Sequence, residues 1–364
     1  MHKTSAWPLA WIYIALVAYA SLYPFSDWRD QGIAPWTFLT AAPPKYWTGF
    51  DVATNVLGYA PLGFLLALSA MRSHRVVRGV MAATLAGALL SLTMETLQSY
   101  LPVRVPSNLD LALNVAGAWL GALLASALER VGAVDRWSRF RGRWFVPEAR
   151  GALVLLALWP VALLFPAAVP FGLGQVFERL ETALADALLD TPFLDWLPLR
   201  EIELQPLIPF AEMVCVMLGL LTPILLGYCI IRSVAHRAWF LLAVLLAGLG
   251  TSALSAALSW GPEHAWAWFG APVKAGLALA VLSGLAMLAA HKRVSVAVLL
   301  LALGLYLSLI NQAPANPYFA QTLQAWEQGR FIRFHGVAQW LGWLWPYATL
   351  AYVLTQAWSR EARN

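Results

Sequence analysis

Three pairs of polar side chains stand inside otherwise apolar stretches of this sequence, and each pair has helical spacing. The pairs are Asp51 with Asn55, Glu95 with Gln98, and Asp110 with Asn114. Residues three or four positions apart lie on one face of a helix, so each acid shares a face with an amide. Acids of this kind can perform general acid–base chemistry, and acids with amides can bind a polar ligand. These residues are therefore the first candidates for a functional site.

The elements that carry these pairs are expected to be membrane helices. Hydrophobic residues make up 60% of the 364 positions and charged residues only 12%, whereas a soluble domain has about 25% charged residues. So little polar surface cannot cover the chain in water, and lipid is expected to surround much of it. The composition excludes a cytosolic enzyme, a disordered protein and a disulfide-rich secreted domain. Cys215 and Cys229 lie in one apolar run, where neither a disulfide nor a metal site is expected.

Ten segments are long and apolar enough to cross a bilayer, which takes about 20 residues per helix. They are residues 8–24, 51–71, 79–100, 109–128, 151–170, 208–231, 239–260, 272–290, 294–312 and 337–357. The predicted fold is therefore an all-α, polytopic membrane protein with about ten transmembrane helices. The stretch 172–207 carries apolar residues at helical spacing among acids. That pattern is typical either of an amphipathic helix on the outer membrane surface or of a helical hairpin packed on the protein.

The basic residues predict the orientation of the chain in the membrane. With the N-terminus inside, 16 of the 24 Lys and Arg residues fall on inside segments and 8 on outside segments. Cytoplasmic loops carry such an excess, so both termini of this multi-pass protein are predicted to be cytoplasmic.

The distribution of spans and charges also predicts the domain organisation. Residues 1–128 form a membrane domain of four helices, 129–150 a basic cytoplasmic linker, and 151–364 a second membrane domain of about six helices. A shift of 160 residues aligns Arg72 with Arg232, so the second domain is also a candidate for a faded repeat of the first.

This topology brings the three pairs to the outer ends of the second, third and fourth spans. A carboxylate at the centre of a membrane helix costs about 2.5–3.5 kcal/mol, so the acids are expected to face one another, a water-filled cleft or a ligand. Asp51 and Asp110 begin helices, where the helix dipole favours an acid, and Ser107 with Asp110 has the spacing of a capping box. Glu95 lacks such an explanation, because it lies near the end of its helix.

The other polar residues of the region have structural alternatives as well. Interhelical hydrogen bonds explain each of the amides Asn55, Gln98 and Asn114 when it is taken alone. Arg104, in the short outer loop, either pairs with the acids or anchors the chain at the interface. Gly117 and Gly121 have the small-xxx-small spacing that lets two membrane helices pack closely.

The order and spacing of these residues resemble those of the VanZ-like family of bacterial membrane proteins. The resemblance depends on Asp51-x-x-x-Asn55, Pro61-Leu62-Gly63-Phe64, Glu95-x-x-Gln98, Pro102-x-Arg104, Ser107-x-x-Asp110-x-x-x-Asn114 and Gly117-Ala118-x-x-Gly121. It covers about residues 8–128, and the remainder is similar to a longer form with a second membrane half. The resemblance implies a location in the bacterial inner (cytoplasmic) membrane and a link to raised resistance to the glycopeptide teicoplanin. The resemblance also implies that the family's polar residues correspond to Asp51, Asn55, Glu95, Gln98, Arg104, Asp110 and Asn114. It assigns no chemical reaction to them.

Three functions remain open from the sequence. The leading hypothesis is an envelope protein that binds an envelope lipid or a glycopeptide-like headgroup in an outer-leaflet cleft lined by those seven residues. The alternatives are a secondary transporter of a small or lipid-linked solute, and an intramembrane enzyme acting on a lipid-linked substrate with Glu95 and Asp110 as its acid–base pair. The sequence leaves enzymatic activity and oligomeric state undecided.

No cofactor and no metal are expected, because phosphate-binding loops and metal-ligand spacings are missing from the sequence. The expected partners are the bilayer and the proposed lipid or glycopeptide. Nucleic acid is not expected as a partner, because the arginines are divided among several loops.

Overall fold

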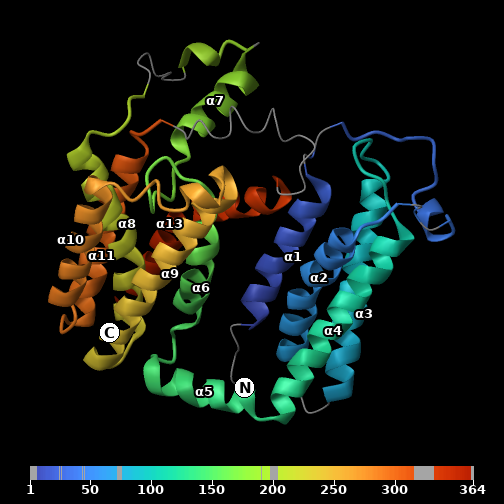
Figure 1. Cartoon of the computed structure of the whole chain (residues 1–364), viewed down its shortest axis with the longest axis horizontal. Coiled ribbons are helices and arrows are strands. Elements are labelled where there is room, and N and C mark those ends of the chain that lie inside the picture. The colour runs from blue at the N-terminus through green and yellow to red at the C-terminus, as the bar shows by residue number, and fades with distance from the viewer. Residues whose placement is uncertain are drawn as a thin grey trace. The chain divides into compact units, whose positions relative to one another are not determined.

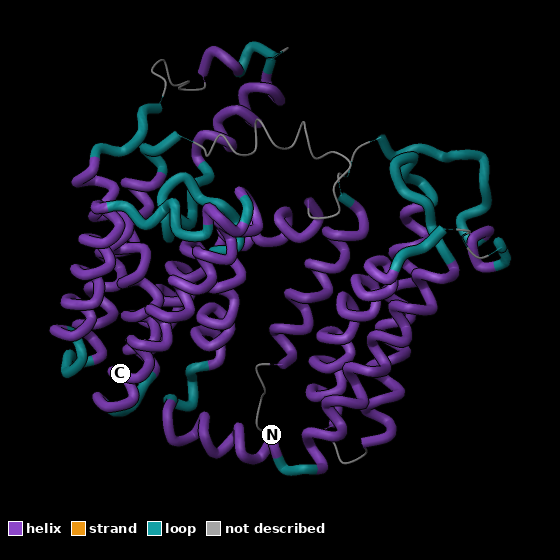
Figure 2. Tube along the Cα trace, in the orientation of Figure 1, coloured by secondary structure: helices purple, strands orange, loops and turns teal. Residues whose placement is uncertain are grey.

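The computed structural model describes residues 6–23, 25, 27–42, 44, 46–71, 76–189, 191–196, 204–314 and 332–361. These residues form twelve α-helices and three short 3-10 helices, and no strand is present among them. The chain divides into two compact units, residues 1–142 and 143–364. Figure 1 shows the course of the helices along the chain, and Figure 2 shows that loops join helices throughout the described part.

Unit 1 is a bundle of four helices followed by a shorter one. The helices are α1 (Ala6–Leu22), α2 (Gly49–Ala70), α3 (Val76–Gln98), α4 (Asn108–Arg130) and α5 (Ala133–Trp144), with a 3-10 helix at Thr37–Leu39. Within the bundle α4 packs closely against both α2 and α3. The short helix α5 lies in the basic segment 129–150 and ends just beyond the unit boundary.

Small residues bring the backbones of α2 and α4 into direct contact. A Cβ atom added at Gly121 would lie 1.8 Å from the carbonyl oxygen of Ala60, and one at Gly117 would lie 2.3 Å from that of Val56. The contact is reciprocal, because a Cβ at Gly63 would lie 1.9 Å from the carbonyl oxygen of Ala118. Glycines at such a crossing permit an approach that any side chain would prevent. This contact fixes the N-terminal turns of α2 and α4 beside each other.

Unit 2 surrounds one almost fully buried helix. Its helices are α6 (Arg150–Ala162), α7 (Phe177–Leu188), α8 (Pro209–Ile230), α9 (Val234–Trp260), α10 (Ala271–Ala286), α11 (Lys292–Ile310) and α13 (Ile332–Glu361), with 3-10 helices at Leu194–Trp196 and Pro262–His264. Within the most apolar part of α8, 83% of the residues are buried inside the protein. Helices α6, α9, α10 and α11 all contact α8. A helix that is apolar on every side and covered on every side forms the core of a bundle.

Six of the described helices are long and apolar enough to cross a membrane, which makes this a multi-pass protein. They are α2, α3, α4, α8, α9 and α11. Three further apolar helices, α1, α6 and α10, are shorter than 18 residues. A helix lies at each of the ten segments proposed from the sequence, but a total of ten spans, and the orientation of the termini, stay predictions.

The predicted helix at 151–170 is wrong in its second half. Helix α6 ends at Ala162, two residues after Pro160, and the chain then runs without helical structure to Val176. Pro166 and Pro170 follow, and a proline lacks the N–H that a helix interior needs and restricts the residue before it. The apolar composition of the segment has another explanation: Phe165, Val169, Phe171 and Leu173 are all buried in unit 2.

The non-helical segment 163–176 reaches the middle of the neighbouring helices. Phe171 packs on Gly219 near the middle of α8 and on Gly248 near the middle of α9, where an added Cβ would collide with it at 2.7 Å in both cases. Phe171 also has a φ of 63°, a left-handed conformation that costs a residue with a side chain about 1–2 kcal/mol. The hydroxyl of Tyr306 in α11 stabilises this turn by donating to the Phe171 carbonyl and accepting the Leu173 N–H.

Candidate functional site

The first turns of α2 and α4 and the last turns of α3 bring most of the predicted site residues together. We call this group the acidic cluster and define it as Asn55, Ser91, Glu95, Asp110 and Asn114. The α2–α4 contact sets the distance between two of the three helices. Asp110 and Asn114 both face this interface, as their helical spacing predicts. Asn55 and Glu95 reach it without their partners Asp51 and Gln98, which bind elsewhere.

Glu95 is the most buried acid of the cluster and has a backbone partner. Only 4% of its surface is exposed, and its Oε2 accepts the N–H of Ser107 at 2.8 Å. The Ser107 hydroxyl caps α4 by accepting the N–H groups of Leu109 (3.2 Å) and Asp110 (3.4 Å). In a capping box the third helical residue would accept the N–H of the capping serine. Here Glu95, from another helix, accepts it, so α3 and α4 are joined through a carboxylate.

Two amides connect the remaining members of the cluster. Asn55 donates from Nδ2 to Oδ1 of Asp110 at 3.0 Å and also to the carbonyl of Asp51, one turn earlier, at 3.0 Å. Asn114 donates from Nδ2 to the hydroxyl of Ser91 at 3.0 Å. The first bond joins α2 to α4 and the second joins α3 to α4.

The cluster retains acceptor capacity and negative charge in its interior. Among the described residues, the buried Oδ1 of Asn114 has no hydrogen-bond donor, and Glu95 forms no ion pair. Asp110 lies close enough to Glu95 for the two carboxyl groups to repel when both are charged. Buried charges are costly unless they are compensated. An added group that donates hydrogen bonds or carries positive charge would therefore stabilise this arrangement.

Three predicted site residues have structural partners outside the cluster. Asp51 completes a capping box with Thr48: its carboxylate accepts the Thr48 N–H at 2.8 Å, and the Thr48 hydroxyl accepts the Asp51 N–H at 3.3 Å. Gln98 donates to the carbonyl of Ser21 at 3.0 Å, and Arg104 donates to that of Tyr23 at 2.5 Å. Gln98 and Arg104 thus bind carbonyls at the end of α1, where donors and cations are favourable.

Sequence reasoning missed two buried polar residues at the same interface. Ser91 is fully buried, and Tyr59 of α2 is only 5% exposed, with its hydroxyl near Ser91. Ser91 precedes Glu95 by four residues, so the helical spacing that selected the polar pairs would have found it. Tyr59 gives no comparable signal, since a tyrosine in an apolar helix is common at interfaces with lipid.

Metal chemistry has no candidate site in the part of the chain that is described. No group of three or more His, Cys, Asp or Glu side chains lies close enough there to hold a metal ion. Cys215 and Cys229 are free and buried. The groups available in the acidic cluster are thus oxygen acceptors and acids, which bind hydroxyl, amide or ammonium donors.

The fold and the cluster together define a multi-pass helical membrane protein with a buried acidic cluster in its N-terminal bundle. Residues 7–129 match the family model VanZ/LLP1. The match confirms the resemblance predicted from the motifs, so this chain carries a VanZ-like domain in a longer form. The matched residues cover α1 to α4, except for the first residue of α1 and the last of α4, and include all seven predicted site residues. No curated protein and no solved structure matches the chain.

Proposed function

We propose that the VanZ-like unit binds the polar headgroup of an envelope lipid, or a glycopeptide-like headgroup, at the acidic cluster. The observation that carries the proposal is Glu95: it is 4% exposed, it has no ion pair among the described residues, and the neighbouring charge of Asp110 repels its carboxylate. Intramembrane acids that face a bundle interior mark functional sites by default, because their insertion costs free energy.

The chemistry of the cluster indicates what part of a headgroup it would take. The carboxylates of Glu95 and Asp110 and the open Oδ1 of Asn114 are all acceptors. A matching ligand presents hydroxyl, amide N–H or ammonium groups, as sugars, amino sugars and peptide headgroups do. In the predicted orientation the cluster lies near the outer membrane surface, where such headgroups are found.

The proposal includes a role in the bacterial cell envelope and in sensitivity to glycopeptides. It assigns the binding contacts to Glu95, Asp110, Asn55 and Asn114. Asp51, Gln98 and Arg104 support the site: they hold the start of α2 and the end of α1 through the contacts described above.

Lipid retention tests the proposal directly. The full chain is purified from membranes as wild type, Glu95→Gln, Asp110→Asn and Glu212→Gln, and the retained lipids are identified by mass spectrometry. Glu212 is a matched control, because it is an acid in the first turn of a membrane helix in unit 2. We expect one headgroup class to be retained by wild type and Glu212→Gln and lost from the two cluster variants. Equal lipid profiles in all four proteins would contradict the proposal.

A secondary transporter is a second candidate because of the interrupted helix α6. The non-helical segment 163–176 reaches the middle of α8 and α9, and interrupted helices at this depth are typical of transporter substrate sites. Proteoliposomes with an imposed pH gradient should then accumulate a lipid-linked or sugar substrate. Uptake equal to that of protein-free vesicles would leave headgroup binding as the better account.

A further inference from the structure

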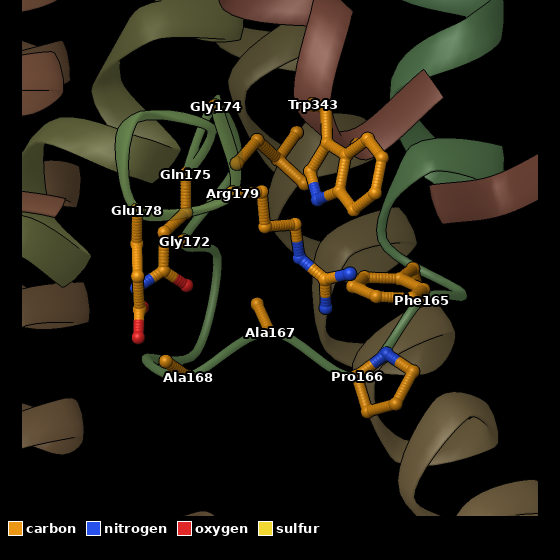
Figure 3. Close-up of a pocket in the computed structure, with 12 residues that line it drawn as sticks. Phe165, Pro166, Ala167, Ala168, Gly172, Gly174, Gln175, Glu178, Arg179 and Trp343 are labelled. Carbon is orange, nitrogen blue, oxygen red and sulfur yellow. The ribbon is translucent and has the colours of Figure 1, made fainter. Parts of the chain in front are cut away.

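A small pocket lined by polar and apolar residues lies within unit 2. Figure 3 shows the pocket between the segment 165–175, the first turn of α7 and the part of α13 that holds Gly342 and Trp343. Its volume is about 20 Å³, enough for one or two water-sized groups. The pocket therefore suits a compact polar group whose remaining parts stay outside.

One cation dominates the pocket. The guanidinium carbon of Arg179 stands 4.7 Å from the centre of the Trp343 ring, within the range of a cation–π contact. Among the described residues, Arg179 donates no hydrogen bond and forms no ion pair. Partial burial lowers the pKa of Arg179 and the charge of Glu178 opposes the shift, but a guanidinium stays protonated in proteins. Its donors are thus available to an anion.

Glu178, the acidic neighbour of Arg179 in the sequence, faces another part of the pocket. In Figure 3 the Glu178 carboxylate points along the opposite wall, away from the guanidinium. The negative charge of Glu178 nevertheless repels an anion bound to Arg179, and it repels a dianion more strongly than a monoanion.

The walls of the pocket are held by hydrogen bonds that do not involve Arg179. Gly174 donates to the carbonyl of Gly342 at 2.7 Å, which joins the segment to α13 beside Trp343. Oδ1 of Asn311 accepts the N–H groups of Val176 and Phe177, both at 3.0 Å. The amides of the cap residue Val176 and of Phe177, the first residue of α7, are thereby occupied. A frame of this kind positions Arg179 before any ligand arrives, which lowers the entropic cost of binding.

From these contacts we infer that Arg179, stacked on Trp343, binds a phosphate group of which one or two oxygens enter this pocket. A planar guanidinium matches two phosphate oxygens with two parallel N–H bonds, and stacking on an aromatic ring holds it in that plane. The apolar rim formed by Phe165, Pro166 and Ala167 would lie against the carbon atoms next to the phosphate. The source is either the phosphodiester of a lipid headgroup or free phosphate, since both offer the same oxygens.

The experiment titrates the full chain in neutral detergent with phosphatidylglycerol and follows binding by native mass spectrometry. The variants are Arg179→Gln, Glu178→Gln and, as a control, Arg29→Gln, an exposed arginine of unit 1. We expect Arg179→Gln to weaken phosphatidylglycerol binding about tenfold, the value of one charge-assisted bond pair. Arg29→Gln should bind as wild type does, and Glu178→Gln should bind several times more tightly.

Competition by millimolar inorganic phosphate distinguishes the two sources. Arg179-dependent displacement of the lipid supports the site with free phosphate as a ligand, and no displacement supports it with the lipid phosphodiester. Equal binding by Arg179→Gln and Arg29→Gln overturns the inference. If Arg179→Gln fails to fold, an unchanged affinity in Glu178→Gln overturns it instead, because the opposing charge would then have no effect.

Discussion

Replacing Gly121 by alanine should separate α2 from α4 and disturb the acidic cluster at a distance. The new Cβ would lie 1.8 Å from the carbonyl oxygen of Ala60, whereas a carbon atom approaches a carbonyl oxygen to about 3.3 Å. The backbones must therefore move apart by about 1.5 Å. No side-chain rotation can avoid this movement, because the obstructing atom belongs to the backbone of α2.

The structure gives the size of the effect on stability and on the cluster. Overpacking of this kind costs about 1–3 kcal/mol. The Asn55–Asp110 bond spans the same pair of helices at 3.0 Å, so a movement of that size takes it beyond hydrogen-bonding distance. Gly121→Ala should thus lower both the stability of unit 1 and the retention of the headgroup.

Gly58→Ala is the matched control on α2. Nothing lies within 4 Å of a Cβ added there, while the gain in helix propensity, at most about 1 kcal/mol, is the same as at Gly121. The assay is thermal unfolding in detergent followed by circular dichroism, with size-exclusion chromatography as a check on folding. Gly58→Ala should unfold at or above the wild-type temperature and Gly121→Ala several degrees below it. Equal unfolding temperatures for the two variants would refute the close contact between α2 and α4.

Three further predictions concern orientation, phenotype and unit 2. A cysteine at Val105, which is 85% exposed in the α3–α4 loop, should react with a membrane-impermeant maleimide on intact cells. A cysteine at Trp137 of α5 should react only after the cells are permeabilised. The two native cysteines are buried and should give little background labelling. Labelling of both sites on intact cells would contradict the predicted orientation. Glu95→Gln should change the teicoplanin sensitivity of cells without changing the protein level, whereas Glu212→Gln should change neither. Growth assays measure the sensitivity and immunoblotting the protein level, and equal sensitivity of the two variants would remove the link to glycopeptides. Tyr306→Phe should destabilise the chain by about 1–2 kcal/mol, because it leaves the Phe171 carbonyl and the Leu173 N–H unpaired, and an unchanged unfolding temperature would show that another group holds this turn.

The helices could be predicted from the sequence, and so could the shared face of Asp110 and Asn114, because both depend on local spacing. Residues three or four positions apart share a helix face whatever the tertiary structure is, and Gly117 and Gly121 signal a close crossing in the same way. The capping role of Asp51 is also indicated by the sequence, because Thr48 precedes it by three residues, which is the spacing of a capping box.

The contacts that decide individual roles depend on tertiary packing and could not be predicted. Glu95 accepts the N–H of Ser107 only because the loop between α3 and α4 folds back to it. Arg179 and Trp343 are far apart in the sequence, and neither position has a pattern that indicates the other. The end of α6 is a different case: Pro160, Pro166 and Pro170 indicate it in the sequence, but the apolar composition of 151–170 fits a membrane helix and a buried loop equally.

The central claim is that the acidic cluster of the VanZ-like unit binds a headgroup, and a structure of the chain extracted with its native lipids tests it most directly. We predict a density that extends from the bilayer to the interface of α2, α3 and α4, with a polar group within hydrogen-bonding distance of the Glu95 and Asp110 carboxyl groups. Continuous protein packing around Glu95, with the N–H of Ser107 as its sole partner and no such density, would contradict the claim.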